Sequence, residues 1–179
     1  MGNGTHSSSV YCNHMKRSSS SLVRILALDL HPRSFGYAVF EDADLLDWGL
    51  RKWPPRQLKT ATRKLRRLFD LWQPMRLVIR EGAPRRVYDM AQGVARNAKV
   101  PVIDVRRAAV QDAFRSSKRP SRFDVARLVA ARFPELSLRL PAARQTGHAE
   151  AFQLRMFSAA ATGIAFLRIS DHTVDDRKK

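Results

Sequence analysis

The stretch from Val23 to Glu41 (VRILALDLHPRSFGYAVFE) constrains the fold more than any other part of the chain. Both faces of its first half are apolar apart from Arg24, which is the pattern of a central strand covered on both sides. The run ends at Asp29, a carboxylate that packing alone does not favour at the end of a buried strand. The following His-Pro-Arg-Ser indicates a turn, and residues 35–40 predict a second strand.

The later segments predict one α/β domain. Residues 44–53 form a third strand, and three strands joined by short turns predict an antiparallel meander. Two further strands, at 76–81 and 100–105, follow helical segments, so we expect them to run parallel to the first strand. The expected fold is therefore a mixed five-stranded sheet, an antiparallel meander followed by parallel strands, flanked by helices. The predicted helices span 56–72, 85–98, 106–114, a segment beginning after Ser121, and 148–167. The first of them has an apolar stripe that includes Ala61, Leu65 and Leu68, and the fourth begins with Ser121 and Asp124 in the pattern of a capping box.

The charge of the chain indicates a polyanionic partner. Among 179 residues, 33 are Lys or Arg and 16 are Asp or Glu, a formal net charge of +17. Such an excess destabilises the compact free protein, so nucleic acid is the leading candidate partner. An anionic membrane is the weaker candidate, because no basic amphipathic helix stands apart from the core pattern. A merely basic surface is the remaining alternative.

The ends of the chain differ in composition from its middle. Residues 1–21 are polar and rich in serine, without an apolar run of signal-peptide length, and we expect a disordered leader there. The domain is expected at 22–169, followed by a charged tail at 170–179. Cys12 is the only cysteine, which excludes an intrachain disulfide and a Cys-based zinc site and fits a reducing cytoplasm. Met1 and Met15 are both possible starts.

Two short motifs in the opening stretch resemble a known family. Asp29-Leu30-His31-Pro32 followed by Gly36-Tyr37-Ala38-Val39 resembles the start of the RNase H-like superfamily, most closely the RuvC-type Holliday-junction resolvases. In that family an aspartate ends the first strand and a glycine-aromatic pair opens the second. The resemblance covers about residues 23–168 and implies an RNase H-like fold. The alternative for Asp29 is that it caps a turn.

The resemblance also implies an activity. RuvC-type resolvases are metal-dependent, structure-selective endonucleases that hydrolyse DNA phosphodiesters, act on branched DNA in recombination and repair, and work as homodimers. The resemblance places Glu81 beside Asp29, Glu150 on the last helix as a third ligand, and His148 nearby as a general base or phosphate contact. Neighbouring carboxylates are costly unless a cation lies between them. An oxygen-only set suits Mg²⁺ or Mn²⁺, and two ions about 3.5–4 Å apart would activate a water and stabilise the leaving oxygen.

Each of the later acids has a structural alternative. Glu81 could pair with the neighbouring arginines, and Glu150 could be a helix-start acid favoured by the helix dipole. The chain also departs from the family at two places. The glutamate normally follows the strand's apolar run directly, where this chain has Arg80, and Ser158 stands in the place of an aspartate. Because side chains alternate along a strand, the one-residue offset would direct Glu81 to the wrong face unless a bulge restores it.

Basic residues near these elements are the expected contacts to the nucleic-acid backbone: Arg33, Arg85, Arg86, Lys118 and Arg119. Two rivals to a DNA nuclease stay open. One is a catalytically impaired, nucleic-acid-binding member of the fold, favoured by Ser158 and the offset of Glu81. The other is an RNA-processing nuclease, such as the related pre-ribosomal-RNA enzymes. A sugar-kinase-like phosphate binder is disfavoured because glycine-rich phosphate loops are missing.

Overall fold

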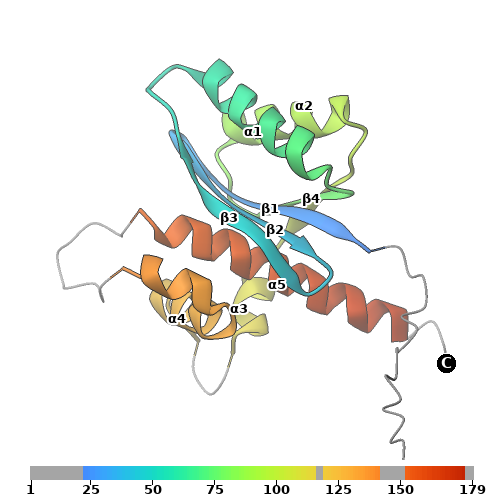
Figure 1. Cartoon of the computed structure of the whole chain (residues 1–179), viewed down its shortest axis with the longest axis vertical. Helices are drawn as coiled ribbons and strands as arrows, with labels where there is room; N and C mark the ends of the chain where they lie inside the picture. The colour runs from blue at the N-terminus through green and yellow to red at the C-terminus, as the bar shows by residue number, and fades with distance from the viewer. Residues whose placement is uncertain (1–21, 116–118, 142–151, 176–179) are drawn as a thin grey trace, which may run out of the picture.

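In the computed structural model, a five-stranded sheet separates two helical layers (Figure 1). The structure describes residues 22–115, 119–141 and 152–175, so the expected leader lies outside the described residues. The strands are β1 (Arg24–His31), β2 (Ser34–Glu41), β3 (Asp44–Lys52), β4 (Arg76–Arg80) and β5 (Val102–Val105). Their order is β3-β2-β1-β4-β5, with β1 to β3 antiparallel and β4 and β5 parallel to β1. The predicted mixed sheet is confirmed.

Strand β1 is the centre of the sheet. It pairs with β2 from Arg24↔Glu41 to His31↔Ser34, and with β4 from Ile25↔Arg76 to Leu28↔Ile79. The residues from Ile25 to Leu28 have no exposed surface, because helices cover both faces. Asp29 follows the last residue of β1 that pairs with β4, and it is 2% exposed.

Two helices cover one face of the sheet. Helices α1 (Leu58–Trp72) and α2 (Arg85–Asn97) pack on the even-numbered side chains of β1, including Leu26 and Leu28. Helix α1 ends at Gln73, whose left-handed backbone (φ 44°) turns the chain toward β4. The predicted apolar stripe of α1 is confirmed, since Ala61, Leu65 and Leu68 are buried.

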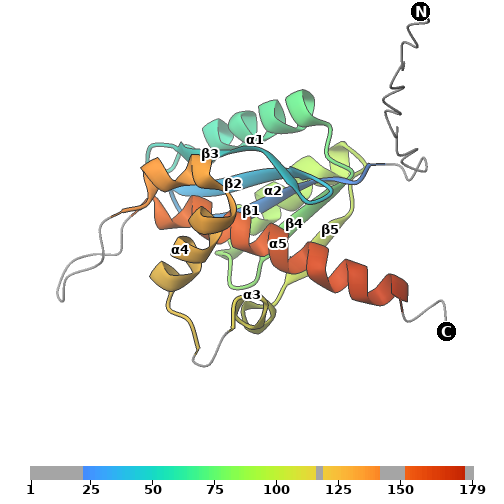
Figure 2. The same cartoon turned by 60° about the horizontal axis from the view of Figure 1, so that its bottom comes forward.

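The other face carries the remaining helices, α3 (Arg107–Ala113), α4 (Arg122–Arg132) and α5 (Leu154–Asp175), with the 3₁₀ helix η1 (Pro134–Arg139) (Figure 2). The N-terminus of α4 is fixed by the expected capping box. The Ser121 hydroxyl accepts from the Asp124 N–H at 3.2 Å, and the Asp124 carboxylate accepts from the Ser121 N–H at 3.0 Å. Asp124 is thus a capping residue, and the hydrogen bonds that its carboxylate accepts from the Ser121 hydroxyl, at 2.7 Å, and from the Ser121 N–H lower its pKa.

Helix α5 lies directly against the sheet. A Cβ on Gly36 of β2 would come within 2.2 Å of the backbone oxygen of Arg155, so only glycine allows this approach. The helix was expected to end near Leu167 but runs to Asp175, because residues 168–175 contain neither Pro nor Gly to stop it. No helix among the residues described is long and apolar enough to cross a membrane.

Candidate functional site

The end of β1 brings Asp29 together with Arg80 of β4. Along β1, Asp29 lies on the same face as Ile25 and Ala27, which pack toward α3, α4 and α5; Arg80 shares that face with Val78. The Arg80 guanidinium donates to Asp29 Oδ1 from Nη2 at 2.9 Å and from Nε at 3.2 Å. This two-nitrogen contact is a strong, charge-assisted pair, and it occupies one oxygen of the carboxylate.

A second arginine faces the other oxygen of the same carboxylate. Arg122, at the start of α4, places Nη2 3.6 Å from Asp29 Oδ2. That oxygen is buried and accepts no hydrogen bond in the structure, so its interaction with Arg122 is electrostatic. Asp29 therefore lies between two guanidinium groups from different elements, and within the described parts of the chain its carboxylate accepts no hydrogen bond from a backbone N–H.

Glu81 has different partners from Asp29. Strand β4 ends at Arg80, and its side chains Leu77 and Ile79 face α1 and α2. Because side chains alternate along a strand, Arg80 rather than Glu81 points toward Asp29. The Glu81 N–H donates to the Val105 carbonyl at 2.9 Å, and its carboxylate accepts from the Arg107 N–H at 3.3 Å. The structure shows no bulge in the pairing of β4 that would return Glu81 to the face of Asp29.

The described residues show no ion pair between Glu81 and a neighbouring arginine, Arg80, Arg85 or Arg86, either. Arg80 pairs with Asp29, and Arg85 lies 3.9 Å from the Asp89 carboxylate. His148, Glu150 and Lys118, the other predicted site residues in this part of the fold, lie outside the described residues.

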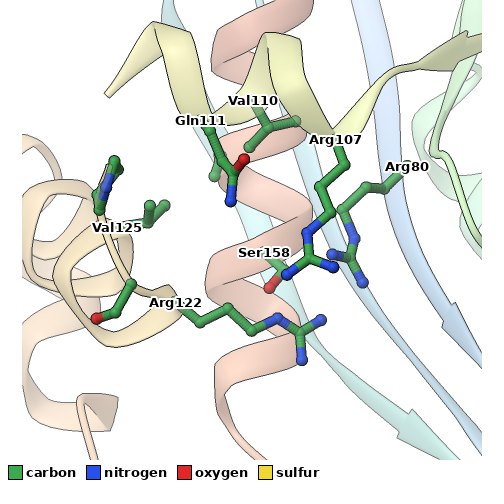
Figure 3. Close-up of a pocket in the computed structure, with 10 residues that line it drawn as sticks. Arg80, Arg107, Val110, Gln111, Arg122, Val125 and Ser158 are labelled. Atoms are coloured by element: carbon green, nitrogen blue, oxygen red, sulfur yellow. The ribbon is translucent and has the colours of Figure 1, made fainter. Parts of the chain in front are cut away.

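A cavity of about 100 Å³ opens beside Arg80, between α3, α4 and α5. We call this cavity the arginine pocket; its polar lining consists of Arg80, Arg107, Gln111, Ser121, Arg122 and Ser158. Figure 3 shows the three guanidinium groups and the Ser158 side chain turned toward a common space. The position where the family resemblance places an aspartate thus lies at this site, but a hydroxyl occupies it.

The described residues do not fit a divalent-metal site. Mg²⁺ and Mn²⁺ need several oxygen ligands, usually carboxylates. In the parts of the chain that the structure describes, no group of three or more His, Cys, Asp or Glu side chains could hold a metal. Instead, arginine nitrogens face both oxygens of Asp29, and the arginine pocket presents hydrogen-bond donors. Such a surface attracts anions and repels cations.

His31, at the end of β1, lies next to this site. Burial lowers its pKa from 6.5, and the nearby Arg155, Arg33 and Arg122 lower it further, whereas Asp29 acts in the opposite direction. Its Nδ1 atom is buried without a hydrogen-bond partner. The lowered pKa favours the neutral imidazole, so among the described residues the positive charge of the site comes from arginines.

The other predicted backbone contacts are placed near the same edge of the sheet. Arg33 lies in the exposed turn between β1 and β2, and Arg85 and Arg86 begin α2 directly after β4. Arg119 donates from Nε to Gln111 Oε1 at 2.7 Å, next to the arginine pocket. The structure gives these residues exposure and position, and their role in binding stays a prediction.

Arg107, Arg122 and Gln111 belong to the site but were not predicted from the sequence. The place of Arg80 could have been found, because the alternation that turns Glu81 away also turns Arg80 toward Asp29. No local sequence pattern identifies Arg107, Arg122 or Gln111 as a site residue. They reach the site only because α3 and α4 pack against α5.

Comparisons with known proteins were made by sequence and by structure. No protein-family model and no curated protein sequence matches the chain. Several solved structures do match. Thermus thermophilus RuvC superposes with a TM-score of 0.59 at 16% identity over 83% of this chain and 97% of that one. T. thermophilus RuvC in complex with a Holliday-junction substrate gives 0.57 at 16% identity over 80% and 91%.

A viral protein gives a comparable result. The Fowlpox virus resolvase, in its complex with substrate Holliday-junction DNA, superposes with a TM-score of 0.55 at 12% identity, over 80% of this chain and 98% of that one. At such low identity the likeness establishes the fold and nothing finer. The topology of the sheet, the place of Asp29 at the end of β1 and these superpositions together give the chain the RNase H-like fold of the RuvC-type resolvases.

Proposed function

We propose that the chain is a nucleic-acid-binding protein that uses a resolvase fold to hold branched DNA without hydrolysing it. The observation that carries the proposal is the ion pair between Asp29 and Arg80. A guanidinium lies where a second metal-binding acid would have to lie, on the same face and beside the same carboxylate. Asp29 is thereby used as a structural counter-ion for arginines.

Two further features support binding as the function. The net charge of +17 favours a polyanionic partner, and the arginine pocket and the exposed Arg33, Arg85 and Arg86 lie near one edge of the sheet. Two proteins with a similar fold were solved with Holliday-junction DNA, which makes a branched duplex the first ligand to test. A homodimer, expected from the resemblance, is also part of the proposal and is tested by light scattering.

A metal-dependent nuclease is the second candidate. One observation favours it: Asp29 is almost fully buried at the end of the central strand, with one oxygen that accepts no hydrogen bond. Glu150 would have to supply a further ligand, with His148 as general base or phosphate contact, and Arg80 and Arg122 would have to leave the carboxylate. Both rearrangements would be driven only by metal or substrate binding.

The two candidates separate in one experiment. A labelled four-way junction, a linear duplex, an RNA–DNA hybrid and a structured RNA are incubated with the protein in Mg²⁺, Mn²⁺ or EDTA, and binding and cleavage are both measured. We expect binding of the junction that survives EDTA, and no cleavage in either metal. Cleavage that needs metal and is lost in Asp29→Asn would overturn the proposal, and preference for an RNA substrate would move the ligand from DNA to RNA.

A further inference from the structure

The arginine pocket has the chemistry of an anion site. Its three arginines can only donate hydrogen bonds. The Gln111 carbonyl oxygen already accepts from Arg119 Nε at 2.7 Å, so the NH₂ group is the part of this amide left for a ligand. The Ser158 hydroxyl can donate as well. No carboxylate is found among the residues that line the cavity.

The charges at this place do not balance. Arg80 and Arg122 share the single buried counter-ion Asp29, and the guanidinium of Arg107 has no ion-pair partner among the described residues. Three positive groups therefore surround a small cavity, with the Asp29 carboxylate behind it and the Glu81 carboxylate bound to the backbone N–H of Arg107 at 3.3 Å. An anion bound in the cavity would offset this repulsion, and arginine matches the geometry of phosphate oxygens better than any other side chain.

The size of the cavity limits the ligand. Its volume of about 100 Å³ is several times the roughly 10–15 Å³ that one water molecule needs. That is room for a compact tetrahedral group, while the sugar and base of a nucleotide would have to stay outside. The contact would therefore be to the backbone and would carry no base sequence information.

We propose that the arginine pocket holds one phosphodiester phosphate of a bound nucleic-acid strand, contacted by Arg107, Arg122, Arg80, Gln111 and Ser158. This inference rests on the proposed function, because the phosphate belongs to the nucleic acid that the protein binds. Asp29 is a positioning residue in this arrangement: it fixes the Arg80 and Arg122 guanidinium groups before the phosphate arrives. Arg107 supplies a charge that has no ion-pair partner among the residues that the structure describes.

The test uses Arg107→Gln, because Arg107 is exposed and its side chain makes no ion pair that the fold needs. The matched control is Arg127→Gln, which removes the same charge from an exposed position on α4 outside the pocket. Circular dichroism and thermal unfolding first establish that both variants fold. Inorganic phosphate, compared with chloride at equal ionic strength, should raise the Tm of the wild type and of Arg127→Gln, and raise that of Arg107→Gln much less.

Binding of the four-way junction then shows whether the phosphate comes from nucleic acid. Arg107→Gln should weaken binding about tenfold, as expected for loss of one charge-assisted contact, and Arg127→Gln much less. A scan of single neutral methylphosphonate linkages should find one position that weakens wild-type binding similarly and has no further effect in Arg107→Gln.

The outcomes separate this inference from the proposed function. If the junction binds but the Arg107→Gln and Arg127→Gln variants have equal affinity, the pocket does not hold a phosphate and the proposed function stands. If no nucleic acid binds to the wild type, the proposed function fails. Stabilisation by inorganic phosphate without any methylphosphonate position coupled to Arg107 would also overturn the assignment to the backbone.

Discussion

At the scale of single residues, Asp29 illustrates how one neighbour decides the use of a carboxylate. A carboxylate that is 2% exposed must be compensated, either by cations or by cationic side chains. In this chain Arg80 and Arg122 provide the compensation. The resemblance predicted the position of Asp29, and the structure places the residue at the expected sheet edge. The resemblance could not predict its partners, because these depend on one step of strand register and on a helix 93 residues later in the chain.

His31 gives a prediction about pH at the same scale. Its folded-state pKa lies below the ordinary 6.5 because the imidazole is partly buried and faces arginines. Between these two pKa values the unfolded chain binds more protons than the folded protein, so the free energy of unfolding falls as the pH drops below about 6.5. Replacing His31 by glutamine, whose amide is uncharged, should remove the part of this loss of stability that comes from protonation of His31.

The measurement is chemical unfolding of the wild type and His31→Gln at about pH 7.5 and about pH 5. We expect the wild type to lose more stability than the variant between the two conditions. Equal losses would show that the His31 pKa is not lowered in the folded protein. The other histidines are unchanged in both proteins, so their contributions cancel in the comparison.

At the scale of elements, the contact between β2 and α5 determines how closely α5 packs against the sheet. Gly36 has the backbone of Arg155 where its Cβ would be, at 2.2 Å from the oxygen and 2.6 Å from the Met156 nitrogen. We expect Gly36→Ala to lower the free energy of unfolding by about 1–3 kcal/mol, because backbone atoms of α5 must move to admit the methyl group.

The control is Gly93→Ala on α2, where an added Cβ meets no atom within 4 Å. This substitution should stabilise the protein by about 0.8–1 kcal/mol, the ordinary gain from replacing glycine by alanine inside a helix. Urea unfolding of both variants measures the two changes. Opposite signs are expected, and a Gly36→Ala protein as stable as the wild type would mean that α5 does not lie as close to β2 as described.

The elements themselves could largely be predicted from the sequence. The strands, the helix order and the capping box at Ser121 followed from periodicity and local chemistry, and they are found close to the predicted bounds except for α5, which runs to Asp175 rather than Leu167. Gly36 belongs to the motif that resembles the resolvases. Glycine is required there because β2 and α5, about 119 residues apart in the chain, approach each other closely, and no local sequence pattern predicts such an approach. The pocket was missed for the same reason, since four elements contribute to it.

At the scale of the whole molecule, the excess of positive charge predicts how binding depends on salt. Each backbone phosphate neutralised by a cationic side chain contributes about −0.9 to the slope of log affinity against log salt concentration on duplex DNA. Four such contacts would lower the affinity roughly 150-fold between about 50 and 200 mM salt. Titration of the four-way junction across this range measures the slope. An affinity that does not change with salt would exclude a backbone-binding function despite the net charge of +17.

The sheet and the helices packed on it do not depend on the residues that make the arginine pocket positively charged. The core is apolar on both sides of the sheet, and the approach of β2 to α5 is a main-chain contact. Arg80 and Ser158 lie outside this apolar core and line the same cavity beside Asp29. Replacing them by Glu and Asp would invert the electrostatic potential of the cavity while the backbone keeps its course. If the arginine pocket binds phosphate as proposed, a fold of this kind would exchange a cation-binding for an anion-binding interior through two side chains.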